Sequence, residues 1–291
     1  MTQAHEPYPE GLVELRPGGA RAPLYCVHPV SGSPYCYTGL SRELDGGQPV
    51  LGFEAPGFDG LGQPAGSIRE LAERHTATLL SVRPHGPYQL LGWSLGGVVA
   101  YEMARLLAAE GAEVPLLVLV DPAVPRPAPL PPVATLTRHF LYDFLGVVEG
   151  QTPELDRAMT RLPAAAGPGE RFAALAAAEA IPEEFDEEFL LERFLLFRTH
   201  LSALLSHPMD AFHDGPALLV RASASPPELL DWRPRVRDLT DHVVTGDHHS
   251  IWRGAGLTAI TRIVGAALLG PDPARGRPRG ATGSPGGDGA A

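Results

Sequence analysis

Short apolar runs alternate along the chain with segments in which apolar residues recur at every third or fourth position. The runs have the length of buried strands, and the periodic segments have the spacing of amphipathic helices. Strands are expected over residues 23–29, 49–55, 88–93, 115–121, 216–223 and 238–246, and helices over about 34–45, 67–82, 97–110 and 256–269. This alternation predicts an α/β fold with a mostly parallel central sheet and helices on both faces.

The alternation stops between residues 122 and 212, where a proline-rich start, DPAVPRPAPLPP, leads into several helical patterns without a convincing strand. Because the strand pattern returns at 216, this segment is interpreted as an inserted helical lid, in preference to a second independent domain. The expected organisation is an N-terminal linker over 1–22, a domain over 23–270 with the lid at about 125–210, and a disordered Gly/Pro/Ala-rich tail over 271–291.

Composition narrows the classes of function. The 291 residues are 44% hydrophobic, and no apolar run reaches the roughly 18 residues that span a bilayer. The net charge of −11 argues against non-specific nucleic-acid binding, which needs a basic surface. Cys26 and Cys36 lack both a disulfide framework and metal-ligand spacing, so both are expected to be buried. With no signal-peptide pattern at the N-terminus, we expect a cytoplasmic protein without a membrane or nucleic-acid partner and without a metal.

The stretch YQLLGWSLGGVVAYEMARLL places a serine where the pattern turns from strand to helix. Its centre, Gly92-Trp93-Ser94-Leu95-Gly96, matches the G-x-S-x-G nucleophile elbow, a turn too tight for side chains at the glycines. The turn would hold the serine hydroxyl at a helix N-terminus, where developing negative charge is favoured. In this context the motif predicts a nucleophile, and a Gly/Ser turn without chemistry is the alternative.

A serine nucleophile needs a base, and the base needs an acid that orients it. In proteins with this elbow the order along the chain is Ser, acid, His, each beyond the end of a strand. Asp121 ends the strand that follows the elbow helix and is preferred as the acid over Asp231, which lies beyond the next strand. The doublet His248-His249 lies between the last strand and the last helix. We choose His248 as the base and place His249 beside it in the pocket wall.

An oxyanion hole needs two backbone N–H groups aimed at the developing charge. One is expected from Leu95, directly after the nucleophile, and the other from Val30 in the loop HPVSGSPY after the first strand. His28 lies in the wrong element for a base and is expected to shape this loop. Trp93 is interpreted equally well as a pocket residue or as a core residue. The other histidines are read as surface or core residues, namely His5, His75, His85, His139, His200, His207, His213 and His242.

Four segments together carry a resemblance to a known family: RPGGARAPLYCVHPVSGSPYCYTGLSREL, GPYQLLGWSLGGVVAYEMARLLAAEG, LLVLVDPAVP and VVTGDHHSIW. They resemble the type I thioesterase domains of nonribosomal peptide and polyketide synthases, members of the α/β-hydrolase superfamily. The resemblance runs from about residue 12 to 269 and is weakest in the lid. It implies a triad of Ser94, Asp121 and His248, oxyanion donors at Val30 and Leu95, and a lid over about 125–210. The family usually has an aromatic residue where this chain has His249.

The resemblance also implies a reaction. A carrier protein, in trans or from an absent upstream domain, would present an acyl or peptidyl chain as a thioester on its phosphopantetheine arm, and no separate cofactor is expected. Ser94 would hold the chain covalently until water releases an acid or an internal nucleophile closes a macrocycle. The alternatives are an editing thioesterase, a small-molecule carboxylesterase on the same fold, and a non-catalytic domain that binds an acyl ligand or a partner.

Overall fold

A computed structural model describes residues 8–60, 62–146, 152–163 and 165–269. These residues form a seven-stranded sheet in the order β1-β3-β2-β4-β5-β6-β7. Only β1 runs antiparallel to its neighbour, β3, and the other pairs in the described sheet are parallel. The strands are β1 (Leu12–Arg16), β2 (Leu24–Val27), β3 (Val50–Phe53), β4 (Gln89–Trp93), β5 (Leu116–Val120), β6 (His213–Ala222) and β7 (Val236–Val244). The predicted α/β class with a mostly parallel sheet is confirmed.

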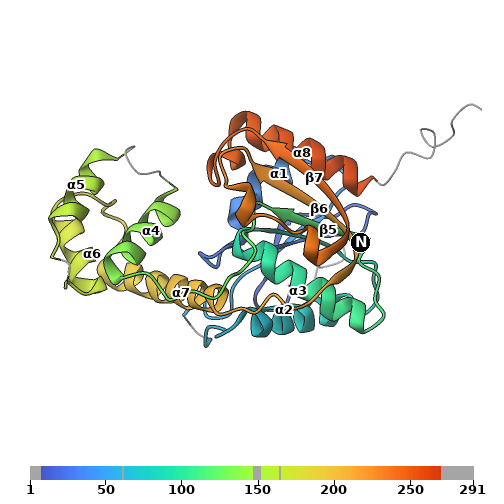
Figure 1. The fold of residues 1–291 in the computed structure, drawn as a ribbon, viewed down its shortest axis with the longest axis horizontal. Coiled ribbons are helices and arrows are strands. Elements are labelled where there is room, and N and C mark those ends of the chain that lie inside the picture. Colours follow the sequence, from blue (N-terminus) through green and yellow to red (C-terminus); the bar gives the residue numbers. More distant parts are fainter. Residues whose placement is uncertain (1–7, 61, 147–151, 164, 270–291) are drawn as a thin grey trace, which may run out of the picture.

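Helices cover both faces of the sheet. Figure 1 shows α1 and α8 on one face and α2 and α3 on the other. The bounds are α1 (Thr38–Glu43), which continues a 3-10 turn at Pro34–Tyr37, α2 (Ile68–Val82), α3 (Leu95–Ala109) and α8 (Gly254–Leu268). The central strand β5 shows how two cores arise, because its residues alternate between the faces. Leu117 and Leu119 pack with α2 and α3, whereas Val118 and Val120 pack on the α8 side.

Four helices lie between β5 and β6 in the described part of the chain, namely α4 (Val133–Leu145), α5 (Pro153–Arg161), α6 (Pro168–Ala177) and α7 (Glu187–Leu205). We call this segment the helical insertion. It has a core of its own, in which Phe140, Phe172, Phe194 and Phe197 are all nearly inaccessible to solvent. Figure 1 shows α4, α5 and α6 to one side of the sheet, while the long α7 leads back toward α2 and α3.

The N-terminal segment differs from the expectation. Residues Leu12–Arg16, assigned above to a linker, form β1 and pair with β3 at the edge of the sheet. Within this strand only Leu12 is buried, and Glu14 is exposed, so the run lacks the apolar density that marked the central strands. The tail expected over 271–291 lies outside the described residues. No helix in the described ranges combines the length and apolarity needed to cross a bilayer.

Candidate active site

Ser94 lies between the end of β4 and the first residue of α3, with φ 55° and ψ −127°. A positive φ is strained for a residue with a side chain, and such strain concentrates at functional turns. The two elbow glycines allow this turn. A Cβ at Gly92 would lie 2.0 Å from the carbonyl oxygen of Gly96, and a Cβ at Gly96 would lie 2.3 Å from that of Val27. No larger residue fits at either position.

The same contact brings two loops together. Because Gly96 lies against the carbonyl oxygens of Val27 and His28, the end of β2 meets the first turn of α3. Leu95 is the first residue of α3, so its N–H belongs to the donors that have no partner within the helix. The predicted second donor, Val30, lies just beyond β2 in a turn closed by a 3.0 Å hydrogen bond from Gly32 N–H to the Pro29 carbonyl.

Asp121 follows β5 directly and is 2% exposed. Its carboxylate accepts three hydrogen bonds: from Ala222 N–H at 2.8 Å, from the Ser225 hydroxyl at 2.6 Å and from His248 Nδ1 at 2.7 Å. Burial raises the pKa of this carboxyl, but the hydrogen bonds from His248, Ser225 and Ala222 outweigh burial and hold the pKa below its ordinary value. Asp121 is therefore an anion that is already bonded to one imidazole nitrogen.

His248 is held by a turn that its neighbours form. The Asp247 carboxylate accepts hydrogen bonds from the N–H groups of His249 and Ser250, both at 2.9 Å, and Asp247 N–H donates to the Ser250 hydroxyl at 2.8 Å. The ring of Trp93 packs beneath, with its centroid 5.0 Å from that of His248. Because His248 Nδ1–H donates to Asp121, Nε2 is left as the nitrogen that can accept a proton. The His248 side chain is 34% exposed.

The sequence left two choices open, His248 or His249 as the base and Asp121 or Asp231 as the acid, and the contacts differ within each pair. In the described structure His248, and not His249, contacts Asp121, whereas His249 packs edge-on against Trp93 with centroids 5.6 Å apart. Burial lowers the pKa of His249. Asp231, the other possible acid, is a surface residue with a 52% exposed side chain, and it accepts a long hydrogen bond from Arg233 N–H.

Trp93 proves to be a core residue. It is 7% exposed and packs with the α8-side core and with Trp252, so it supports the loop that carries His248.

Ser225 was not predicted from the sequence. The only signal was the SASP segment directly after β6, whose end lies beside the end of β5.

A second group of histidines surrounds the loop after β2. His28 is fully buried, and its ring centroid lies 5.2 Å from that of His75 on α2 and 5.1 Å from that of His200 on α7. His200 Nδ1 donates a 2.8 Å hydrogen bond to the carbonyl oxygen of Val30. We call His28, His75 and His200 the buried trio. The expectation that His28 shapes this loop agrees with its place, but sequence spacing did not reveal its two partners. In the described residues no group of His, Cys, Asp or Glu is arranged to hold a metal ion.

A cavity of about 470 Å³ lies between the loop after β2 and the helical insertion. Its wall contains Ser31, Ser33 and Cys36 from the body, Phe58 from the loop after β3, Phe140, Asp143 and Phe144 from α4, and Phe189 and Arg193 from α7. We call this space the aromatic cavity. None of the predicted site residues, Trp93 and His249 included, is itself in its wall, but Ser31 next to Val30 is. Cys36 was expected to be buried like Cys26, but it is only partly buried, because it faces this cavity.

Polar contacts from both ends of the insertion fix it to the body. On the α7 side, His200 bonds to Val30 and the Arg193 guanidinium donates to the carbonyl oxygen of Phe58. On the α4 side, Arg253, which precedes α8, donates to the carbonyl oxygen of Gly146 at 2.7 Å. The aromatic cavity lies between the body and the insertion, and Ser31 in its wall directly follows Val30.

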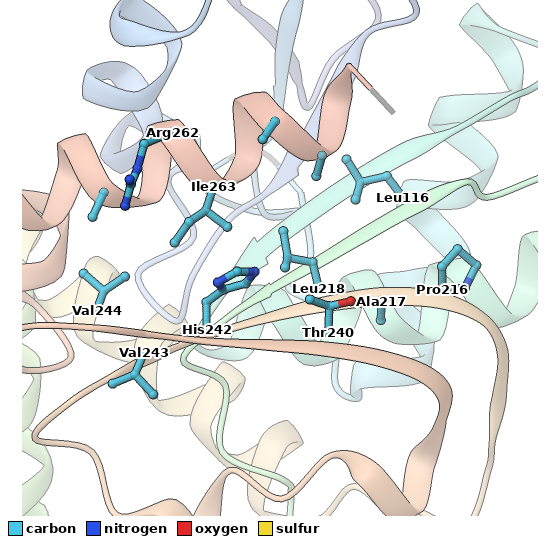
Figure 2. A pocket seen from close by; sticks show the side chains of 13 residues that line it. Leu116, Pro216, Ala217, Leu218, Thr240, His242, Val243, Val244, Arg262 and Ile263 are labelled. Atoms are coloured by element: carbon cyan, nitrogen blue, oxygen red, sulfur yellow. The ribbon is translucent and has the colours of Figure 1, made fainter. Parts of the chain in front are cut away.

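A larger hollow of about 770 Å³ lies elsewhere, between α8 and strands β5 to β7. Figure 2 shows Arg262 and Ile263 of α8 on one side of it and His242 and Val244 of β7 on the other. None of the predicted site residues lines this groove.

With this geometry established, comparison with known proteins identifies the family. The thioesterase domain family matches residues 22–268, most of the chain. The chain belongs to the thioesterase family. The family match agrees with the resemblance inferred from the four sequence segments and with the α/β-hydrolase fold that it implied.

Relatives of this thioesterase include large synthetases. Over 110 residues it is 46% identical to Malpinin synthetase of Mortierella alpina, a match that covers 38% of this chain and 1% of that protein. The chain thus spans a very small part of this relative. The structure of holo-AB3403, a four-domain nonribosomal peptide synthetase, matches with a TM-score of 0.73 and 28% identity over 90% of this chain and 20% of that one. The NocB thioesterase domain from the nocardicin cluster shares the fold, with a TM-score of 0.64 and 22% identity over 89% of this chain and 99% of that domain.

Proposed function

We propose that this thioesterase releases an acyl or peptidyl chain from a phosphopantetheinyl carrier protein through an acyl-enzyme on Ser94. One observation carries the proposal: His248 Nδ1 lies 2.7 Å from the buried Asp121 carboxylate, in the loops that adjoin the strained elbow. The similarity to nonribosomal peptide synthetases supports a carrier-bound substrate. The chemistry uses side chains and backbone groups of this chain, without a cofactor of its own.

In the first half-reaction the Ser94 hydroxyl attacks the thioester carbonyl carbon while His248 Nε2 takes the hydroxyl proton. The Asp121 anion stabilises the imidazolium that forms, because it already accepts the Nδ1–H. The N–H groups of Val30 and Leu95 stabilise the oxyanion. The carbon–sulfur bond then breaks, His248 gives its proton to the departing sulfur so that phosphopantetheine leaves as the thiol, and the chain stays esterified to Ser94.

In the second half-reaction a nucleophile attacks the carbonyl carbon of the Ser94 ester while His248 takes the proton of the nucleophile. The bond between this carbon and Ser94 Oγ then breaks, and His248 returns the proton to Oγ. Water gives a free acid, whereas an amine or hydroxyl of the bound chain gives a macrocycle. The helical insertion acts as the lid in this proposal, and the aromatic cavity shields part of the chain from bulk water. The mass of the released product distinguishes the two outcomes.

The test is intact-protein mass spectrometry after mixing the protein with an acyl carrier protein or with an acyl-N-acetylcysteamine thioester. We expect a mass increase of one acyl group that Ser94→Ala abolishes. His248→Ala tests the second step: if a slow acylation still occurs in this variant, the adduct should persist because deacylation lacks its base.

Three outcomes would redirect the assignment. Faster turnover of simple esters than of carrier thioesters would indicate a carboxylesterase. A strong preference for short acyl groups on the carrier would indicate an editing enzyme. If the folded protein binds the carrier but no thioester acylates Ser94, the domain is a binding module and the proposal fails.

A further inference from the structure

The aromatic cavity contains one feature that an apolar substrate does not explain. Asp143 lies on α4, in the cavity wall that Phe140 and Phe144 also line, and no hydrogen bond or ion pair joins its carboxylate to a residue of the described ranges. Asp143 is partly buried, and a carboxylate that loses part of its hydration without gaining a partner is destabilised. Such a group in a pocket that holds a ligand points to a partner supplied by that ligand.

Arg193, the cation in the same wall, is already engaged. Its guanidinium lies over the ring of Phe58 at 4.2 Å and near that of Phe189 at 5.1 Å, and it donates to the Phe58 carbonyl. It forms no ion pair with Asp143 in the described structure, so the two opposite charges occupy separate parts of the cavity. The α4 side is therefore the anionic part of the cavity, and Phe140 and Phe144 line the wall there.

The position of Asp143 favours contact with the substrate. Asp143 shares the cavity wall with Ser31, the residue after the proposed oxyanion donor Val30, and its charge interacts with that of His248. Burial raises the pKa of Asp143 to about 6, while the charge of His248 acts in the opposite direction. The carboxyl is thus mostly ionised at neutral pH, and a bound cation would lower its pKa further.

On the basis of the proposed function, we propose that Asp143 is a specificity-determining residue that binds a protonated amine on the acyl or peptidyl chain. The ammonium group would form a charge-assisted hydrogen bond with the carboxylate, and the carbons beside it would pack against Phe140 and Phe144. Aromatic faces around an ammonium add a favourable cation–π interaction. The substrate class is therefore an aminoacyl or peptidyl thioester with a basic amine, rather than a purely aliphatic acyl thioester.

The experiment uses a series of ω-aminoacyl N-acetylcysteamine thioesters of increasing length, each paired with an acyl thioester in which a methyl group replaces the ammonium. The readout is the ratio of the two rate constants for acylation of Ser94, measured by intact mass. We expect the wild-type protein to prefer the amine at one chain length by about tenfold or more, the value of a hydrogen bond to a charged group.

Asp143→Asn keeps the shape of the side chain and removes its charge, so this preference should fall by a similar factor. Glu188→Gln is the matched control, since it removes one negative charge from an exposed position on α7 outside the cavity wall, and it should leave the ratio unchanged.

Several results would overturn the assignment. One is a wild-type protein with no preference for the amine at any length, a result that needs no variant to fold. Another is an equal loss for both members of each pair in Asp143→Asn, which would make Asp143 a partner of His248 rather than of the substrate. A preference for ω-carboxyl thioesters would assign recognition to Arg193 instead. Failure of every thioester to acylate Ser94 would refute the proposed function itself, which is a different result from acylation without selectivity.

Discussion

Two groups of histidines contact the loops around the elbow, and they differ in their partners. His248 donates to a buried carboxylate and remains partly open to solvent. The buried trio has only backbone carbonyls as hydrogen-bond acceptors in the described structure, at Pro29 for His28 and at Val30 for His200. The Nε2 atoms of all three are buried without a partner among the described residues. His248 thus has an anionic partner and access to solvent, whereas the buried trio has neither.

The difference shows that a histidine becomes a base through its environment. Burial, followed by mutual repulsion of the rings, lowers the pKa of His28 far below its ordinary value. Burial also lowers the pKa of His75 to about 3 and that of His200 to about 4. The three imidazoles of the buried trio therefore stay neutral at physiological pH, so they do not need an anionic partner. His248 instead has an anion in place for the imidazolium that the proposed reaction forms.

The sharpest test of this comparison is His248→Ala beside His249→Ala. Losing the base of a serine triad costs on the order of 10⁴-fold or more, so acylation of Ser94 should nearly cease in the first variant. His249 makes no hydrogen bond with Asp121, and its loss should cost less than about tenfold, since it removes ring contacts with Trp93 and His248 but no bond to the acid. Stopped-flow release of the thiol measures both rates. Equal losses would mean that the doublet shares the role.

Removing the charge that distinguishes His248 should have the next largest effect. Asp121→Asn keeps the shape of the side chain but removes the anion, and we expect a loss of roughly 10⁴-fold in acylation at neutral pH. Ser225→Ala removes one of the three hydrogen bonds to Asp121 and should cost far less. A full pH profile of both variants is the measurement. Activity of Asp121→Asn close to that of the wild type would refute the assignment of the acid.

The buried trio should make the free energy of unfolding depend on pH in the acid range. The pKa of His75 and His200 is lowered on folding from 6.5, so the unfolded chain takes up protons first as the pH falls. Above pH 6.5 the two histidines do not reduce the free energy of unfolding. As the pH falls below 6.5 this free energy decreases, down to about pH 4 for His200 and about pH 3 for His75, by up to about 1.4 kcal/mol per pH unit for each histidine.

Urea unfolding at pH 7 and pH 5 measures this loss. His75→Phe should make the free energy of unfolding less dependent on pH than in the wild type. Asp143, whose raised pKa acts in the opposite direction, is present in both proteins and cancels in the difference. A variant with an unchanged or steeper dependence would contradict the neutral state of His75.

The smallest expected effect concerns the contact between the trio and the site. His200→Phe removes the hydrogen bond to the Val30 carbonyl, and the loop that carries the proposed Val30 N–H donor should become less well placed. We expect acylation to slow by about tenfold, the cost of one misdirected hydrogen bond. His200→Gln offers a donor again and should recover part of the rate. A loss of thermal stability without a change in rate would limit His200 to packing.

The sequence revealed most of the body because its strands are dense apolar runs. It placed Ser94 at the elbow, Asp121 at the end of β5 and His248 in the loop before α8, and the structure has all three there. It missed β1, whose edge position leaves Glu14 exposed. It also missed Ser225, because an isolated serine in a loop carries no pattern.

What the sequence determined by itself is local: the G-x-S-x-G turn, the strand ends and the apolar periodicity, each of which follows from steric and hydrophobic constraints on neighbouring residues. The tertiary structure decided which histidine of the doublet meets Asp121, that Trp93 packs in the core, and that His28, His75 and His200 converge. It also placed Asp143 in a cavity with aromatic residues from three segments. These features join residues far apart in the chain, and contact at such separations depends on how the sheet and the helical insertion pack together, which no spacing in the sequence encodes.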